Sequence, residues 1–189
     1  MSIATTEPLL HRAMVVWHML RSPRLAPGSA ARERVLGKLD QSDREILEHV
    51  RPADWVDEWL TVRLTEALVD GLGLADDETV RKYFRDHQTV AYSRVYKMVL
   101  SFLKPRTLLD RAGWFWTRQH RSGQLVVDRF GDDWAKGRIV DHPPIAHRLY
   151  AIAVLAGIEA TLALTGAAPV RGEIVATGPD WAEFEVRWG

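Results

Sequence analysis

Residues 181–188 read WAEFEVRW, and together with the run VRGEIVAT at residues 170–177 they decide the fold. In the last run charged residues alternate with four small or apolar ones, Ala182, Phe184, Val186 and Trp188. This alternation is typical of a strand with one buried face and one wet face. Gly178-Pro179-Asp180 separates the two runs, so we predict an antiparallel hairpin.

A second hairpin is predicted upstream. Residues 124–130 and 134–141 have the composition of strands, and Gly131-Asp132-Asp133 lies between them as a turn. Between the two hairpins, residues 149–164 are apolar nearly all round, which indicates a helix buried on most sides. Two hairpins around one helix suggest a ββαββ unit with a four-stranded antiparallel sheet.

The chain before residue 122 has helical periodicity. Ser29, Ser42 and Asp54 are predicted N-caps, and Gly73 a helix end. One long helix is expected from Asp76 or Asp77 to residue 102, with Val80, Phe84, His87, Ala91, Val95, Met98 and Phe102 facing the core. Residues 1–24 fit either a helix or a strand. The fold class is therefore α+β: a single domain over residues 1–189, mainly helical over 1–122 and ββαββ over 123–189.

Composition limits the chemistry. The 189 residues are 47% hydrophobic and 26% charged, as expected for a globular domain. There is no cysteine, which excludes disulfides, thiolate metal sites and cysteine nucleophiles and fits a reducing, cytoplasmic compartment. The N-terminal residues do not resemble a secretory signal. Glu159 interrupts the apolar run over residues 149–170, so no membrane span is expected.

Charge is unevenly distributed. The net charge is zero, so nucleic acid is not an expected partner. Residues 40–78 nevertheless hold 12 acidic and 3 basic residues, and residues 81–129 hold 11 basic and 3 acidic ones. These two segments should attract each other within the fold or between protomers.

Several stretches carry a family resemblance: Gly28-Ser29, Lys38-Leu39-Asp40, Asp43-Arg44, Pro52-Ala53-Asp54-Trp55, Gly157, residues 164–167 and residues 178–188. In these the chain resembles the superfamily of four-vinyl-reductase domains, TRAPP vesicle-tethering subunits and haem nitric-oxide-binding domains. The nearest likeness is to an uncharacterised paralogous family of myxobacteria. The resemblance implies a helical half packed on a four-stranded sheet, often dimeric, with a role in sensing, ligand binding or assembly.

Two departures from that superfamily concern cofactors. The four-vinyl-reductase pattern has cysteines near the last hairpin, and this chain has none. The haem-binding branch has a Tyr-x-Ser-x-Arg signature, whereas the nearest text here is Tyr92-Ser93-Arg94, with a different spacing. We therefore expect that no haem or transition metal is required.

Two residues are weak candidates for binding a cofactor or ligand. His87 lies on the expected inward face of the long helix, where it is either a core histidine or a haem ligand. Glu159 is the one acid in the apolar helix; it either serves a ligand pocket or pairs with a sheet arginine such as Arg138 or Arg187.

The other histidines show no metal-ligand spacing. His11 and His18 would share a helix face, and His142 and His147 flank a helix start. No His-Glu-x-x-His, phosphate loop or nucleophile elbow is present, so no catalytic or metal-binding residue is assigned.

We interpret the chain as a non-enzymatic sensing or protein-assembly module that forms a homodimer or binds a protein partner. The alternative is a domain that holds an apolar small molecule or acyl chain between helices and sheet; an enzyme of unknown class ranks third. Trp55 and Trp59, one turn apart on a helix and rimmed by Asp54, Asp57 and Glu58, are the first interface candidates. The small-residue face around Ala153 and Gly157 is the second.

Overall fold

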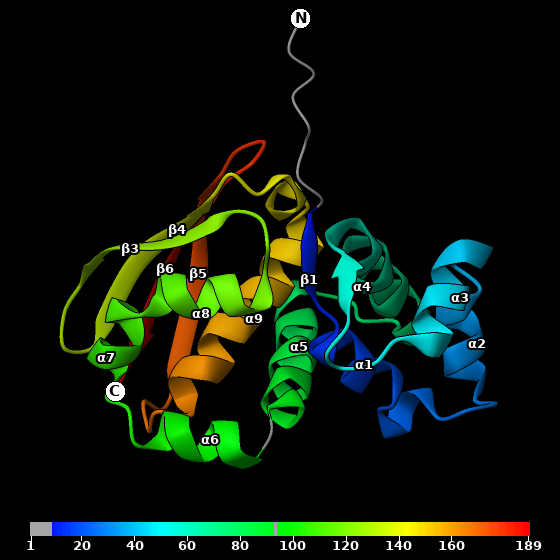
Figure 1. Ribbon diagram of the computed structural model, residues 1–189, viewed down its shortest axis with the longest axis horizontal. Coiled ribbons are helices and arrows are strands. Elements are labelled where there is room, and N and C mark those ends of the chain that lie inside the picture. The colour runs from blue at the N-terminus through cyan, green and yellow to red at the C-terminus, as the bar shows by residue number, and fades with distance from the viewer. Residues whose placement is uncertain (1–8, 93) are drawn as a thin grey trace, which may run out of the picture.

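The computed structural model describes residues 9–92 and 94–189. It has an N-terminal helical half and a C-terminal four-stranded antiparallel sheet, which confirms the predicted α+β class (Figure 1). The strand order is β3 (Gln124–Phe130), β4 (Trp134–Val140), β6 (Ala182–Trp188) and β5 (Val170–Thr177). Both hairpins therefore form, and β4 pairs with β6 to join them into one sheet.

The register of the sheet follows the alternation in the sequence. Gly137 lies opposite Phe184, and Ala135 opposite Val186. The inward side chains of β4 and β6 are buried, namely Ala135, Ile139, Ala182, Phe184 and Val186. The helix α9 (Arg148–Ala163), preceded by the short 3-10 helix η2 (Pro143–Ala146), packs on this face and on α5 (Asp77–Ala91).

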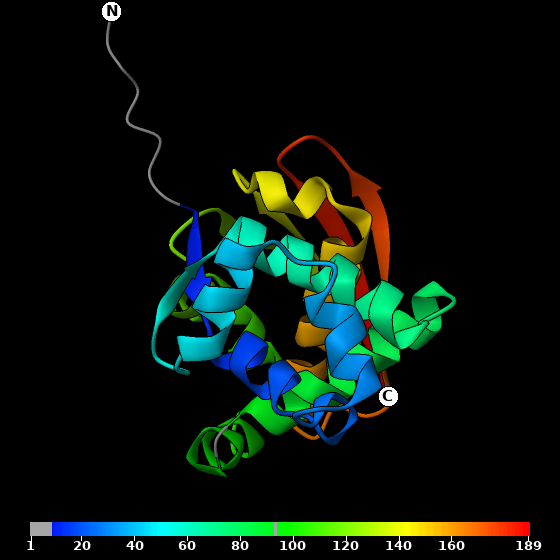
Figure 2. The ribbon, with the colours of Figure 1, turned by 90° about the vertical axis from the view of Figure 1, so that its right-hand side faces the viewer.

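The helical half is a set of short helices: α1 (Met14–Leu20), η1 (Pro23–Leu25), α2 (Ala30–Leu36), α3 (Gln41–His49) and α4 (Glu58–Leu72). Figure 2 shows α2 and α3, in blue and cyan, on the side away from the sheet. Ser29 caps α2 and Gly73 ends α4 at φ 66°, both as predicted. Asp40 rather than Ser42 caps α3, because its side chain accepts the Asp43 amide.

A two-stranded ribbon was not predicted. The strand β1 (Leu10–Arg12) pairs antiparallel with β2 (Trp55–Asp57). The prediction that Asp54 caps a helix containing Trp55 is wrong, because Asp57 caps α4 and holds the amide of Trp59. Trp55 and Trp59 therefore do not lie on one helix.

The expected long helix is two helices, α5 and α6 (Arg94–Ser101). Tyr92 ends α5 in an extended conformation, so the chain changes direction after it. Val80, Phe84 and Ala91 are buried as predicted, but Met98 and Phe102 are exposed. The side chain of Val95 lies outside the described residues. Pro105 begins α7 (Pro105–Asp110), and α8 (Ala112–Gln119) follows.

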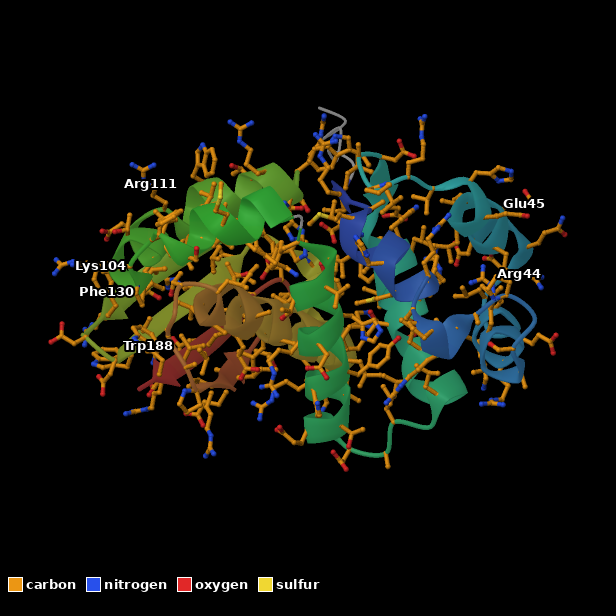
Figure 3. The ribbon with its side chains drawn as sticks, turned by 90° about the horizontal axis from the view of Figure 1, so that it is seen from below. Arg44, Glu45, Lys104, Arg111, Phe130 and Trp188 are labelled. Atoms are coloured by element: carbon orange, nitrogen blue, oxygen red, sulfur yellow. The ribbon has the colours of Figure 1, made fainter. Side chains whose placement is uncertain are left out.

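Two apolar cores meet at α9. Ile152, Ala153 and Ala156 contribute to the core of the helical half, and Ala151 and Leu155 to the core under the sheet. Figure 3 shows α3, with Arg44 and Glu45, at one end of the molecule and Phe130 and Trp188 of the sheet at the other. Within the described residues, no helix combines the length and apolar character needed to span a membrane.

Candidate functional site

A cavity of about 230 Å³ lies where the two halves meet. Its wall comes from α1, α5, α8 and α9 and from the inner face of β3, β4 and β6. Most of that wall is apolar, with Val16, Phe84, Leu108, Phe115, Ile158 and Phe184 among its residues. The cavity is therefore suited to an apolar molecule.

The same wall has a polar group of His11, Thr61, His120 and Tyr150. His11 bonds through Nε2 to the Thr61 hydroxyl. His120 and Tyr150 both bond to the carboxylate of Glu58. Since His11 and His120 stack at 5.9 Å between ring centroids, these residues form one cluster beside the cavity.

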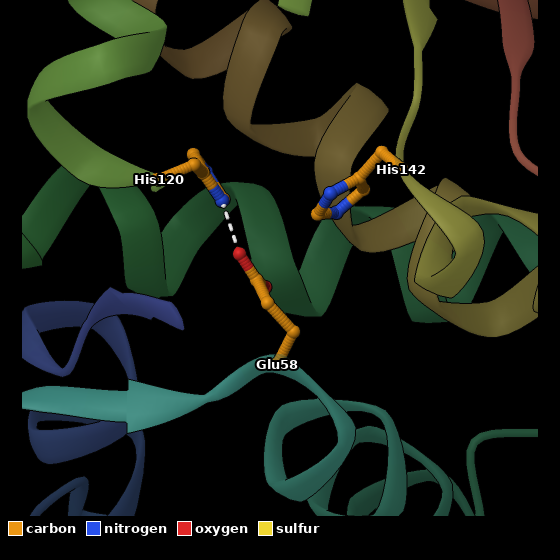
Figure 4. Close-up of side chains that lie close together, drawn as sticks. All are labelled: Glu58, His120 and His142. Atoms are coloured by element: carbon orange, nitrogen blue, oxygen red, sulfur yellow. Dashed lines mark hydrogen bonds and ion pairs between the residues drawn. The ribbon is translucent and has the colours of Figure 1, made fainter. Parts of the chain in front are cut away.

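Glu58 is the centre of this cluster, and it is fully buried. Its Oε1 lies 2.8 Å from His120 Nδ1, and its Oε2 accepts a 2.7 Å hydrogen bond from the Tyr150 hydroxyl. His142 Nε2 is 3.2 Å from the same hydroxyl, and its Nδ1 is 3.2 Å from Ser122 Oγ. Figure 4 shows His120 and His142 converging on the carboxylate from different segments.

Local structure fixes each of these side chains. Glu58 is the first residue of α4, where Asp57 provides the cap. His120 is the C-cap of α8, and its amide donates to Trp116 O at 2.8 Å. His142 precedes η2, and its amide donates to Asp180 O at 2.8 Å. The cluster therefore joins a helix start, a helix end and the end of the first hairpin.

Aromatic packing holds the two imidazole rings. His120 stacks on Trp116 with centroids 3.7 Å apart and planes inclined by 9°. His142 meets the edge of the same indole at 5.3 Å. Trp116 is itself anchored, since its Nε1 donates to Ser122 O at 3.0 Å. The rings thus have little freedom to leave the carboxylate.

The electrostatics of the cluster favour an ionised Glu58 and neutral His11 and His142. Burial alone would raise the pKa of Glu58, but the hydrogen bond and charge of His120 outweigh it and lower that pKa to about 2. Burial lowers the pKa of His11 and of His142 to about 4, although Glu58 opposes this. Burial and the adjacent Glu58 raise the pKa of Tyr150 well above 10.0. At neutral pH Glu58 is therefore a carboxylate and His11 and His142 are neutral.

The sequence-based pairing of histidines does not match these contacts. His11 meets His120 rather than His18, whose ring lies against Trp17. His142 meets Tyr150, whereas His147 lies against Trp59. The spacing along the chain could not reveal this, because Glu58 and His120 are 62 positions apart.

Glu58 is the residue that sequence reasoning misplaced. The sequence predicts it on the charged rim of an exposed tryptophan surface, whereas the structure buries it completely. The acid lies between two tryptophans in a strongly acidic segment, so no pattern distinguishes it from its exposed neighbours. Its burial depends on β1 pairing with β2, which turns the start of α4 inward.

The two candidate cofactor or ligand residues lie elsewhere. His87 is not among the described residues of the cavity wall; its Nδ1 is 2.8 Å from Tyr83 O, and its ring packs on Tyr83 at 4.1 Å. Glu159 is buried as expected, but its partners are Arg85 at 3.2 Å, Arg81 at 3.6 Å and the Gly172 amide at 2.7 Å. Burial raises the pKa of Glu159, although the contacts with Gly172, Arg81 and Arg85 act to lower it.

The two sheet arginines predicted to pair with Glu159 form ion pairs with other residues. Arg138 pairs with Asp128 at 3.3 Å, and Arg187 pairs with Glu185 at 2.5 Å. The sheet-arginine prediction is wrong because α9 presents Glu159 to the basic face of α5.

The interface candidates make contacts inside the chain. Trp55 lies between the guanidinium groups of Arg12 and Arg121, at 4.2 and 4.4 Å, and is half-buried. Trp59 is half-buried against His147. Ala153 and Gly157 face α5, where Gln88 Nε2 donates to Ala153 O at 2.8 Å. Both surfaces are thus at least partly covered by the chain itself.

No protein-family model and no curated protein matches this sequence. Solved structures do match. An Fe(II) unliganded mutant of an H-NOX protein from K. algicida is 10% identical, with a TM-score of 0.65 over 94% of this chain and 96% of that chain. A mutant of T. tengcongensis H-NOX is 14% identical, with a TM-score of 0.60 over 93% and 94% of the two chains.

An oxygen-binding H-NOX domain related to soluble guanylate cyclases is 12% identical, with a TM-score of 0.59 over 93% of this chain and 91% of that chain. At such identities the likeness concerns the fold. The haem-nitric-oxide-binding part of the resemblance is thereby confirmed at the level of architecture: this chain has the fold of H-NOX domains.

Proposed function

We propose that the protein is a non-enzymatic sensing module that holds a small apolar molecule in the cavity between its helices and its sheet. One observation carries the proposal: the cavity lies between the helices and the sheet, and most of its wall is apolar, with a hydrogen-bonded group around His120 and Tyr150 among its polar side chains. A mainly apolar molecule with few polar atoms matches such a wall. The likeness to H-NOX folds supports a sensing role.

The fold implies haem, but the residues present do not fit it. Haem iron needs an axial ligand such as histidine. Of the imidazoles of the wall, His11 is bonded through Nε2 to Thr61, and the ring of His120 is stacked on Trp116 with centroids 3.7 Å apart. The propionates of haem need cations, whereas Arg12 bonds to the Ala53 carbonyl and Lys136 pairs with Glu183 at 2.9 Å. The cavity is also below the roughly 300–1,000 Å³ of sites for drug-sized ligands.

Native mass spectrometry of the purified protein tests the main proposal. We expect extra mass from a bound small molecule, or, after its removal, uptake of one equivalent from a series of linear alcohols and fatty acids. Val154→Phe should fill the cavity and abolish uptake, since Val154 belongs to the wall. Val175→Phe, on an exposed position of the outer sheet face, is the matched control. Uptake that Val154→Phe leaves unchanged contradicts the proposal, and so does a stoichiometric Soret band on addition of haemin.

Self-association is the second part of the proposal. Val90 at the end of α5, Met98 and Val99 of α6, and Phe102 directly after α6 are exposed, with Phe102 81% exposed. Exposed apolar patches of this kind mark interaction surfaces. We propose that this patch, rather than the half-buried Trp55 and Trp59, meets a second copy of the chain.

Kinship with four-vinyl-reductase domains and TRAPP subunits, and with the myxobacterial family, belongs to the same proposal and is supported by the ββαββ arrangement. We also propose a cytoplasmic location, which the absence of cysteine supports.

A further inference from the structure

We propose that Glu58, His120 and His142 form a binding site for a divalent first-row transition metal ion, with Zn²⁺ as its representative. Each residue offers one ligand atom, and these atoms all lie within 4.8 Å of one another. Zn²⁺ binds imidazole nitrogen and carboxylate oxygen at about 2.0–2.2 Å, so its tetrahedral ligand atoms lie about 3.4 Å apart. Metal binding would draw these atoms together from separations of up to 4.8 Å.

The chemistry of the three groups suits a metal ion at neutral pH. Metal ligands must be a carboxylate and neutral imidazoles rather than protonated groups. Glu58 offers a carboxylate oxygen, and His120 and His142 each offer a ring nitrogen. Glu58 and His142 are both fully buried. A buried carboxylate is costly unless it is paired, and a cation compensates it directly.

Further side chains orient the ligands. Metal-bound histidines usually make a second hydrogen bond through the other ring nitrogen. His142 has such a bond, because its Nδ1 lies by Ser122 Oγ while its Nε2 faces the Tyr150 hydroxyl. Tyr150 in turn donates to Oε2 of Glu58 and leaves Oε1 facing His120. The stack of His120 on Trp116 fixes the remaining ring.

Three protein ligands leave a coordination position open. Closed structural zinc sites have four protein ligands, whereas sites with three keep one for water or another small ligand. His120 and Tyr150 belong to the cavity wall, so the metal site lies next to the cavity. The metal site does not depend on what the cavity holds, because its ligands are defined by their own contacts.

This proposal opposes our expectation from the sequence that no metal is required. That expectation depended on ligand spacing along the chain, and the three ligands come from α4, the end of α8 and the segment before η2. The alternative is a metal-free hydrogen-bonded cluster with the same residues.

A cobalt titration distinguishes the metal site from the metal-free cluster. The full chain is first stripped of metal with a chelator. We expect visible d–d absorption that saturates at one equivalent of Co²⁺ and is abolished by Zn²⁺, together with a higher melting temperature in Zn²⁺. His120→Gln and His142→Gln should each weaken binding by at least roughly 100-fold, because loss of an outer-shell partner alone costs about 10–100-fold. His147→Gln is the control: this half-exposed histidine lies 3.5 Å from Glu66, outside the cluster, and its loss should leave binding unchanged.

A measurement on the wild-type protein covers the case in which the variants fail to fold. In a nitrogen-15 spectrum, Zn²⁺ should shift the imidazole signals of His120 and His142 and leave those of His18 and His147 in place. Absence of a one-equivalent Co²⁺ spectrum overturns the proposal. Equal affinity in folded His120→Gln and His142→Gln does so too, since the metal would then lie elsewhere.

Discussion

The Tyr150 hydroxyl donates a 2.7 Å hydrogen bond to Glu58 Oε2 across 92 positions of the chain, and both groups are buried. Tyr150 lies on α9, which packs under the sheet, and Glu58 begins α4 in the helical half. This hydrogen bond therefore connects the two halves of the fold directly. A buried carboxylate that loses such a donor is left partly unsatisfied.

We predict that Tyr150→Phe lowers the free energy of unfolding by about 1.5–3 kcal/mol, the range for a hydrogen bond to a charged group. Urea denaturation in the presence of a chelator measures it. A double-mutant cycle with Glu58→Gln isolates the pair, because the loss from Tyr150→Phe should shrink once the carboxylate has become an amide. Equal losses in both backgrounds would show that the bond does not couple the two residues.

Acid should destabilise the metal-free protein in two stages. His11 and His142 titrate at about 4 in the folded chain against an ordinary 6.5, so the unfolded chain binds more protons between these values and stability falls as pH drops from about 6.5 to about 4. Glu58 titrates at about 2 against an ordinary 4.5, so its contribution is present above about 4.5 and is lost as pH falls towards about 2.

Urea unfolding at several pH values with a chelator present measures this dependence. The loss between pH 6.5 and 4 should be smaller in His11→Gln, which removes one of the two histidines with lowered pKa values. A stability that stays flat over this window would mean that these imidazoles are not held neutral by burial.

Strand patterning predicted the C-terminal half well, because the sheet has one buried face and one wet face. Gln124–Phe130 and Val170–Thr177 are strands over the residues predicted for them. The alternation of apolar and charged residues, such as Phe184 and Glu185, indicates a strand and its buried face without knowledge of any long-range contact. The helical half was harder, since α5 ends at Ala91 and α6 begins at Arg94 with no proline or glycine between them.

The site could not be predicted, because it depends on tertiary contacts alone. The sequence pattern places His142 beside a helix start and Glu58 beside Trp59, and it does not single out His120. In the structure β1 pairs with β2, which directly precedes Glu58, and His11 of β1 forms an isolated bridge with His120. Glu159 was easier, because an acid in an apolar helix is unusual in itself, but its arginine partners on α5 needed the structure.

Removal of residues 181–189 should prevent folding. The deletion takes away β6, which lies between β4 and β5, and with it the buried side chains of Phe184 and Val186. Burial of a large apolar side chain contributes about 1.5–3 kcal/mol, so the loss is comparable to the stability of a whole domain. Circular dichroism should show no cooperative melt for the truncated chain. An intact melt would mean that β6 is not a central strand.

Self-association should depend on α6. Phe102 is 81% exposed, and Met98 and Val99 beside it are also exposed, so Phe102→Ser removes the largest apolar side chain of this patch. Light scattering at low and high salt should show a dimer for the wild type and a monomer for Phe102→Ser. The acidic segment 40–78 and the basic segment 81–129 should make the dimer weaker at high salt if they meet across the interface.

Trp59→Ala discriminates between the two candidate surfaces. Trp59 packs half-buried against His147, so this variant should lose some stability and keep the dimer. If the dimer dissociates in folded Trp59→Ala but persists in Phe102→Ser, the interface is the tryptophan surface expected from the sequence and not the α6 patch. A wild-type monomer at every salt concentration would exclude self-association, and the α6 patch would then have to serve a different protein, because its exposed apolar side chains are not covered within the described chain.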